Sequence, residues 1–272
     1  MSVSAQTFDY VRELVERRSA IQLPPGKEYL VENRLLPLAR AAGMAGPNAV
    51  DHFVLRALGS EETKVQVVEA LTTNETSWFR DGVPFMLLED VILPECRRDR
   101  RGPLRVWSAA CSTGQETYSI AMSLIDQGEE DFTVLGTDLS GAVLERARAG
   151  VYTQLEVNRG LPVSALVNHF DRAGTGWQVA ADVRAHVGFR QHNLLDAPPA
   201  GPLFDVVFVR NVLIYFDAAA RRDVLARIAR VVRPGGFVIL GAAETLPLDP
   251  PWERIDVPAG VLHRLAPERG RP

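Results

Sequence analysis

Two acidic side chains, Glu116 and Asp138, each follow a short apolar segment that is typical of a buried strand. Residues 104–107 and then a turn of small residues precede Glu116, and residues 132–135 precede Asp138. In doubly wound sheets, an acid about 20 residues after such a turn accepts hydrogen bonds from ribose hydroxyl groups. The residue types and their spacing therefore predict a nucleoside-binding site.

The turn between residues 108 and 114 limits which nucleoside could bind. Gly114 is its only glycine, so the G-x-G-x-x-G pattern that lets a pyrophosphate reach a helix N-terminus is missing. S-adenosylmethionine has no phosphate and needs no such pattern, and small residues leave room beside the main chain. Two alternatives stay open: an ordinary strand-to-helix turn, and a capping box in which Glu116 bonds back to Thr113.

The surrounding pattern of strands and helices predicts an α/β fold with a Rossmann-like, doubly wound sheet. Ile120, Ala121, Leu124 and Ile125 recur at helical spacing, and residues 204–210 are apolar enough for a strand buried on both faces. The other expected elements are a helix over 219–232 that ends at Arg233-Pro-Gly-Gly236, and strands over 237–240 and 260–265. Ligands of such sheets bind at the carboxyl ends of the strands.

Further polar residues follow the other predicted strands. Asn193 and Leu194 come after the strand that contains residues 186–189, where an amide and an apolar wall suit an adenine. A turn residue and a core leucine are an equally natural interpretation. Arg210, Asn211 and Tyr215 follow the central strand, and a strand-end acid such as Asp138 is often only a helix cap.

Two segments lie outside this alternation. Residues 6–73 carry four apolar stripes at helical spacing, separated by Pro- and Gly-containing breaks, and Pro37 should kink the second helix or end it early. Between 150 and 193, Gly174-Thr-Gly176 followed by alternating Val179, Ala181 and Val183 predicts an inserted β-hairpin. The polar segment 71–80 is either a connector pinned by its aromatic residues or a lid over the ligand.

Composition excludes several classes of protein. The chain has 272 residues, 46% of them hydrophobic, and a net charge of −4, which argues against a nucleic-acid partner. Cys96 and Cys111 fit neither a metal spacing nor a disulfide framework, so we expect no metal. The chain has no signal-peptide pattern and no apolar run of about 18 residues, which predicts a cytoplasmic protein without membrane insertion.

Several motifs together resemble the CheR-type chemotaxis receptor methyltransferases, which use S-adenosylmethionine to esterify glutamates on chemoreceptors. In family order they read ERRSAIQLPPGKEYLVENRL, LTTNETSWFRD, RVWSAACSTGQETYSIAM, TDLS, HNLLD and FVRNVLIYF. The resemblance covers nearly the whole chain. The sequence departs from the family at Thr117, where proline is usual, and at Ala243, where serine is common.

The resemblance implies roles for individual residues. It places the family's contacts to S-adenosylmethionine, and to the product S-adenosylhomocysteine, on Asn74, Thr76, Arg80, Glu116, Asp138, Asn193, Leu194, Arg210 and Asn211. Glu116 would bind the methionine end and Asp138 the ribose. Arg80 and Tyr215 are the candidate catalytic residues, because they could hold and orient the acceptor carboxylate.

The same resemblance implies a domain plan and partners. We expect a helical receptor-recognition domain over 1–75, a junction helix over 76–90, and a methyltransferase domain over 91–272 with its hairpin at about 170–190. The partner would be the cytoplasmic methylation region of chemoreceptors, approached by a monomer. Because the hairpin segment is short, binding of the receptor's C-terminal tail is not expected. The alternatives are a non-catalytic module that binds S-adenosylmethionine or docks on receptors, and a small-molecule or nucleic-acid methyltransferase.

Overall fold

The computed structural model describes residues 3–99, 102–246 and 251–266. Contacts divide the chain into two compact units, each described by itself. The first unit comprises Met1–Thr73 with Tyr215–Arg221, and the second comprises Asn74–Ile214 with Arg222–Pro272.

The first unit is helical, as predicted. Its four helices are α1 (Ala5–Ser19), α2 (Glu28–Ala41), α3 (Ala49–Leu58) and α4 (Glu61–Leu71). Serine side chains begin two of them: Ser4 accepts a hydrogen bond from the Thr7 N–H and Ser60 one from the Thr63 N–H, which satisfies otherwise unpaired donors. The predicted early end of the second helix at Pro37 is wrong, because α2 continues to Ala41 with Leu35 and Ala39 buried on the same face.

The second unit is built on a seven-stranded sheet with the order β6-β2-β1-β7-β8-β10-β9. The strands are β1 (Leu104–Ala109), β2 (Phe132–Asp138), β6 (Val187–Gln191), β7 (Phe204–Val209), β8 (Val232–Leu240), β9 (Trp252–Val257) and β10 (Gly260–Leu265). The first five in this order run parallel, whereas β10 is antiparallel to β8 and β9. The predicted doubly wound fold is confirmed, and every residue of β7 is buried.

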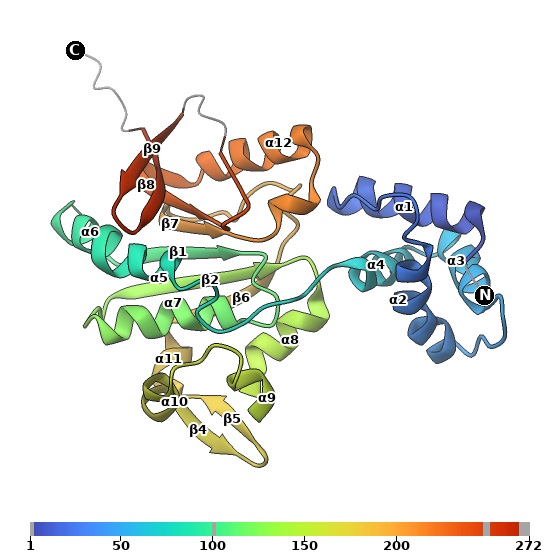
Figure 1. Ribbon diagram of the computed structural model, residues 1–272, viewed down its shortest axis with the longest axis horizontal. Coiled ribbons are helices and arrows are strands. Elements are labelled where there is room, and N and C mark those ends of the chain that lie inside the picture. Colours follow the sequence, from blue (N-terminus) through green and yellow to red (C-terminus); the bar gives the residue numbers. More distant parts are fainter. Residues whose placement is uncertain (1–2, 100–101, 247–250, 267–272) are drawn as a thin grey trace. The chain divides into compact units, whose positions relative to one another are not determined.

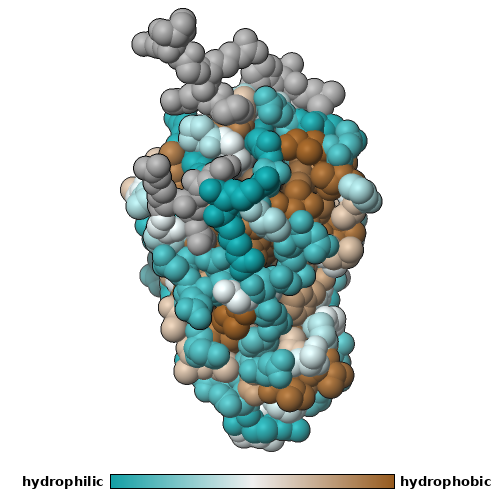
Figure 2. Space-filling model, turned by 90° about the vertical axis from the view of Figure 1, so that its left-hand side faces the viewer, coloured by the Kyte–Doolittle hydropathy of each residue, from teal (hydrophilic) through white to brown (hydrophobic). Residues whose placement is uncertain are grey.

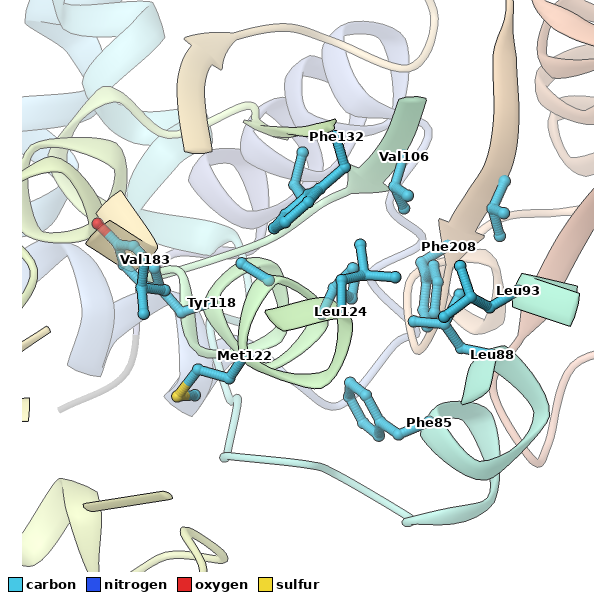
Figure 3. Packing of buried hydrophobic residues seen from close by; sticks show 14 of the residues in the cluster. Phe85, Leu88, Leu93, Val106, Tyr118, Met122, Leu124, Phe132, Val183 and Phe208 are labelled. Atoms are coloured by element: carbon cyan, nitrogen blue, oxygen red, sulfur yellow. The ribbon is translucent and has the colours of Figure 1, made fainter. Parts of the chain in front are cut away.

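Helices cover both faces of this sheet, with α7 and α12 on opposite sides (Figure 1). They are α5 (Val83–Leu87), α6 (Leu93–Asp99), α7 (Gln115–Asp126), α8 (Gly141–Ala149) and α12 (Ala218–Ala229), with the π-helical turn η1 (Leu88–Ile92) between α5 and α6. Figure 3 shows side chains of α5, α7, β1 and β7 in one cluster, including Phe85, Leu124, Val106 and Phe208. This core fixes the strand ends that carry the candidate site.

A smaller subdomain lies between α8 and β6. It contains the three-stranded sheet β3-β5-β4. Its elements are β3 (Val151–Tyr152), α9 (Gln154–Val157), α10 (Val163–His169), β4 (Phe170–Ala173), β5 (Gly176–Val179) and α11 (Ala181–Ala185). The hairpin turn at Gly174 is confirmed, but the predicted continuation through Ala181 and Val183 is wrong. These residues form helix α11, where Val183 is buried.

The last third of the sheet also differs from the prediction. Helix α12 ends at Ala229 instead of 232, and the Arg233-Pro-Gly-Gly236 segment lies inside β8 instead of forming a break. Pairing explains the difference, because Val232 already pairs with Phe204 of β7 at a register shift. Strand β9 was not predicted, and it pairs along its whole length with the expected β10.

On the face that Figure 2 shows, hydrophilic residues dominate and the hydrophobic ones gather in separate patches. The most exposed large apolar side chains are Leu155, Val163 and Val167 of the subdomain. Within residues 3–99, 102–246 and 251–266, no helix has both the length and the apolar character needed to cross a membrane.

Candidate functional site

Strained backbone marks the carboxyl ends of the parallel strands. Among the described residues, six that are not glycine have a positive φ, and five of them are Phe79, Asp81, Ala110, Ser112 and Asn211. Two of these five lie in the junction segment, by which we mean residues 74–82 before α5. Two others lie in the loop after β1, and one lies just after β7. Such conformations cost about 1 to 3 kcal/mol each and persist where the surroundings hold them, typically at functional sites.

Asp138, at the end of β2, holds the loop that follows β1. Its Oδ2 accepts a hydrogen bond of 2.8 Å from the Ser112 N–H and its Oδ1 one of 3.0 Å from the Ser140 N–H. Ser140 is the N-cap of α8, so the helix-cap interpretation describes part of what this carboxylate does. The bond to Ser112 adds a second role, because it fixes a residue with a φ of 51°.

The junction segment is tied to the same loop. The Ser112 hydroxyl donates to the Asn74 carbonyl at 2.8 Å, and the Phe79 N–H donates to the Ser119 hydroxyl of α7 at 3.1 Å. Trp78 is 1% exposed and its ring meets the Tyr152 ring edge-on. Asn74 and Thr76, both predicted site residues, are half-buried in this segment.

Glu116 does not form the capping box. The N-cap of α7 is Gly114, without a side-chain hydrogen bond, and Thr113 bonds instead to Gln115. The two Glu116 oxygens accept from the Ser108 hydroxyl and from the Arg210 guanidinium, both at 2.8 Å. The structure therefore brings together two predicted cofactor residues that lie 94 positions apart.

Arg210 follows β7 and is surrounded by acceptors. Its side chain is 1% exposed, and besides Glu116 it contacts the Arg80 carbonyl at 2.8 Å and the Asp81 carboxylate at 2.7 Å. Two carboxylates and a carbonyl compensate the charge of this buried guanidinium, while its Nε has no hydrogen-bond partner among the described residues. Arg210 thus joins the junction segment to Glu116. Its predicted contact with the cofactor stays a prediction.

The two candidate catalytic residues occupy different parts of the structure. The Arg80 guanidinium donates to the Glu75 carbonyl at 3.1 Å within the junction segment. Tyr215 ends the short 3-10 helix η2 (Leu213–Tyr215) and groups with the helical unit, where its carbonyl accepts from the Gln22 N–H at 2.9 Å. Their roles on an acceptor carboxylate stay predictions.

Asn193 and Leu194 follow β6, which neighbours β2 in the sheet. The Asn193 side-chain oxygen accepts from the Leu195 N–H at 3.0 Å, and Leu194 is buried. One residue earlier, the His192 N–H donates to the Asp138 carbonyl. The pair thus reaches the same edge as Asp138, while the turn-and-core interpretation also matches these contacts.

Gly114 is required by packing within the protein. A Cβ added there would lie 2.9 Å from the Ala147 Cβ, 3.1 Å from the Tyr152 hydroxyl and 3.2 Å from the Phe189 ring. Its φ of 94° also favours glycine. Gly114 therefore allows α8, β3 and β6 to pack against the turn.

Cys111, within the same turn, has a buried thiol. Burial raises the pKa of its thiol well above the usual range, and the nearby Asp138 carboxylate raises that pKa further. The thiol form therefore persists at neutral pH.

The sequence interpretation gave Glu244 no role, although it lies at this edge of the sheet. It is 8% exposed and accepts hydrogen bonds from five backbone N–H groups, four of them in the segment after β7. Its signal in the sequence is the one that singled out Asp138: an acid placed just after an apolar strand, here residues 237–240.

These side chains fit S-adenosylmethionine chemically. Glu116 and Asp138 offer carboxylate oxygens, which accept hydrogen bonds from an ammonium group and from ribose hydroxyls. Asn193 offers an amide and Leu194 an apolar surface for a purine. Asp138 ends β2, Asn193 and Leu194 follow β6, and Glu116 lies in the first turn of α7, which follows β1. Ligands of doubly wound sheets bind at these carboxyl ends of the strands.

Known proteins match both units of the chain. The family model described as the CheR methyltransferase all-alpha domain matches residues 6–72, and the one described as the CheR methyltransferase SAM binding domain matches residues 74–258. The chain is 39% identical to chemotaxis protein methyltransferase 1 of Pseudomonas aeruginosa, over 97% of this chain and 99% of that protein. It is 35% identical to the chemotaxis protein methyltransferase of Escherichia coli, over 90% of this chain and 86% of that protein. The chain belongs to the CheR methyltransferase family, and its α/β domain is the domain that binds S-adenosylmethionine.

Proposed function

We propose that this protein transfers the methyl group of S-adenosylmethionine to glutamate carboxylates of chemoreceptors, forming methyl esters. The observation that carries the proposal is the convergence of the predicted site residues at one edge of the sheet. Asn74, Ser112 and Asp138 form one set of contacts there, and Glu116, Arg210 and Arg80 form another. The relatives named chemotaxis protein methyltransferases support the acceptor class.

The residues of this edge have separate tasks in the proposed reaction. Asp138 would hold the ribose hydroxyls, Glu116 the ammonium group, and Asn193 with Leu194 the adenine. When bound, S-adenosylmethionine supplies a methyl group on a positively charged sulfur. The methyl carbon gains a bond to the acceptor oxygen as its bond to sulfur breaks, so the protein must hold the two reactants in line.

The acceptor needs no general base. A glutamate side chain has an ordinary pKa of about 4.3 and is already a carboxylate at neutral pH. The contribution of the protein is therefore positioning and the exclusion of water. Arg80 would hold the acceptor carboxylate and the Tyr215 hydroxyl would orient it, without the tight ground-state binding that would cost rate.

The helical unit is the proposed receptor-recognition domain, and residues 76–90 are the proposed junction. Glu28, Glu32, Arg34 and Arg40 lie on α2, where acidic and basic residues balance. A receptor methylation region rich in glutamate would gain little from long-range attraction to such a helix. We therefore expect methylation to change little between low and physiological salt.

The test is transfer of a radiolabelled methyl group from S-adenosylmethionine to membranes that contain the chemoreceptors of the same source. A label on a receptor band that is released by mild base supports glutamate esters. The variant Glu116→Gln, which alters a proposed cofactor contact, should lose this labelling. A label that survives base would indicate methylation of an amide or amine instead. If calorimetry shows binding of S-adenosylhomocysteine but no receptor is labelled, the non-catalytic module is the better description.

A further inference from the structure

The carboxylate of Glu244 lies between the carboxyl ends of two neighbouring parallel strands, β7 and β8. Its Oε2 accepts from the N–H groups of Asn211 and Gly241 at 2.8 Å each. Its Oε1 accepts from the N–H groups of Val212 at 2.9 Å, Leu213 at 2.7 Å and Ile214 at 3.3 Å. One buried carboxylate thus accepts hydrogen bonds from the N–H groups of all four residues, 211–214, that follow Arg210.

The local structure is shaped to let this carboxylate approach. A Cβ at Gly241 would lie 2.7 Å from Glu244 Oε2 and 2.9 Å from both the backbone and side-chain nitrogens of Asn211. Contacts that short would force the carboxylate or Asn211 to move. Glycine at 241 is therefore a condition of the arrangement, independent of the hydrogen bonds themselves.

The segment held by Glu244 is strained and carries a proposed site residue. Asn211 has a φ of 57°, a left-handed conformation that costs energy even for asparagine, although less than for most residues. Its side chain is one of the proposed cofactor contacts, and Arg210 before it pairs with Glu116. A strained turn keeps its conformation only if the surrounding contacts determine it, and Glu244 provides the contacts to four successive N–H groups.

We propose that Glu244 is a positioning residue for methyl transfer: by binding the N–H groups of residues 211–214, it holds Arg210 and Asn211 in the conformation that the cofactor site requires. The inference rests on the proposed function but concerns a residue outside the predicted site. In this proposal Glu244 acts through the main chain, by way of the N–H groups that it binds.

Glu244→Gln is the direct test, because it keeps the size of the side chain and replaces one accepting oxygen by a donor. We expect kcat/KM for methyl transfer to fall about tenfold or more, since misplaced groups of this kind cost that much. We also expect weaker S-adenosylhomocysteine binding by calorimetry. The second readout needs no receptor, so it still tests Glu244 if the proposed glutamate acceptor is wrong.

Asp205→Asn is the matched control. Asp205 is 5% exposed and accepts from the Arg105 N–H at 2.8 Å, but it lies at the amino end of β7. Both variants lose a buried carboxylate that holds main chain, and both should lower the unfolding temperature. If Glu244 positions the site, Asp205→Asn keeps kcat/KM and product affinity within about twofold under conditions where it is folded, whereas Glu244→Gln does not.

Gly241→Ala keeps the inference testable if Glu244→Gln does not fold. It retains the carboxylate but places a methyl group against Oε2 and Asn211. We expect the same pattern of reduced kcat/KM and weaker product binding. A folded Glu244→Gln or Gly241→Ala protein with activity and affinity within twofold of the parent would overturn the proposal, as would an equal loss in Asp205→Asn.

Discussion

Buried charge has different tasks at the two edges of the seven-stranded sheet. At the amino edge, Asp205 accepts from the Arg105 N–H and pairs with Arg233 at 2.7 Å, so strands are joined to strands. At the carboxyl edge, Asp138 and Glu244 accept from loops that contain left-handed residues such as Ser112 and Asn211. A buried carboxylate therefore marks stability at one edge and an imposed loop conformation at the other, and only the partner groups distinguish the two.

The largest expected effect is the difference in the free energy of unfolding between variants of Arg210 and Arg233. Arg210→Met leaves the Glu116 and Asp81 carboxylates without their cation, and its side chain is 1% exposed, so we expect a loss of about 3 to 5 kcal/mol in the free energy of unfolding. Arg233→Met, at a side chain that is 26% exposed, should cost less. Urea denaturation measures both. Equal losses, or unchanged methyl transfer by folded Arg210→Met, would contradict the comparison.

The next effect concerns cofactor affinity. Asp138→Ala should weaken S-adenosylhomocysteine binding by about 1 to 3 kcal/mol, because charge-assisted hydrogen bonds are lost and the Ser112 N–H loses its acceptor. Asp205→Ala removes a carboxylate of similar burial at the other edge and should leave affinity unchanged. Calorimetry decides this, and undiminished binding in Asp138→Ala would remove Asp138 from the site.

A smaller effect is expected for the residues assigned to the acceptor. Arg80→Ala and Tyr215→Phe should each lower kcat by about tenfold and should lower it more than they weaken product binding, the pattern of a contact that is stronger in the transition state. Steady-state rates with saturating S-adenosylmethionine measure it. If Tyr215→Phe keeps full turnover, the hydroxyl has only a packing role.

The sequence predicted the elements whose signal is local. Strands β1, β2 and β7 and the four N-terminal helices follow from apolar periodicity, and Glu116 and Asp138 from their places after strands. Strand β9 was missed because its alternation is carried by polar residues such as Glu253 and Asp256. Helix α12 was predicted to be longer than it is, because Val231 and Val232 continue its apolar stripe. In the structure Val232 pairs with Phe204 and belongs to β8.

The contacts of the site that the sequence did not predict join residues that lie far apart in the chain. The ion pair of Glu116 with Arg210 joins residues 94 positions apart, so no spacing rule could find it. Glu244 follows an apolar strand as Asp138 does, but its role was missed because its partners are backbone N–H groups of residues 211–214, about 30 positions away. The packing role of Gly114 was missed because the residues it packs against, Ala147, Tyr152 and Phe189, belong to elements that meet only in the folded chain.

The smallest expected effect is at the subdomain. Its edge strand β4 has four residues and pairs with β5 on one side, so an added peptide strand would gain few main-chain hydrogen bonds. Receptors shortened at the C-terminal tail should therefore be methylated as fast as intact ones, and a free tail peptide should show no heat of binding. A large drop in rate would show that the short sheet still acts as a tether.

The Tyr152 hydroxyl donates to the Thr113 carbonyl at 2.7 Å, from the first strand of the subdomain to the turn after β1. The same hydroxyl is among the atoms nearest to a Cβ at Gly114. This contact has a consequence for grafting. We expect a subdomain grafted at this place to keep the turn intact only if it supplies a hydroxyl at the position of Tyr152 and the recipient keeps glycine at 114, so an exchange of the insertion reaches beyond its own boundary.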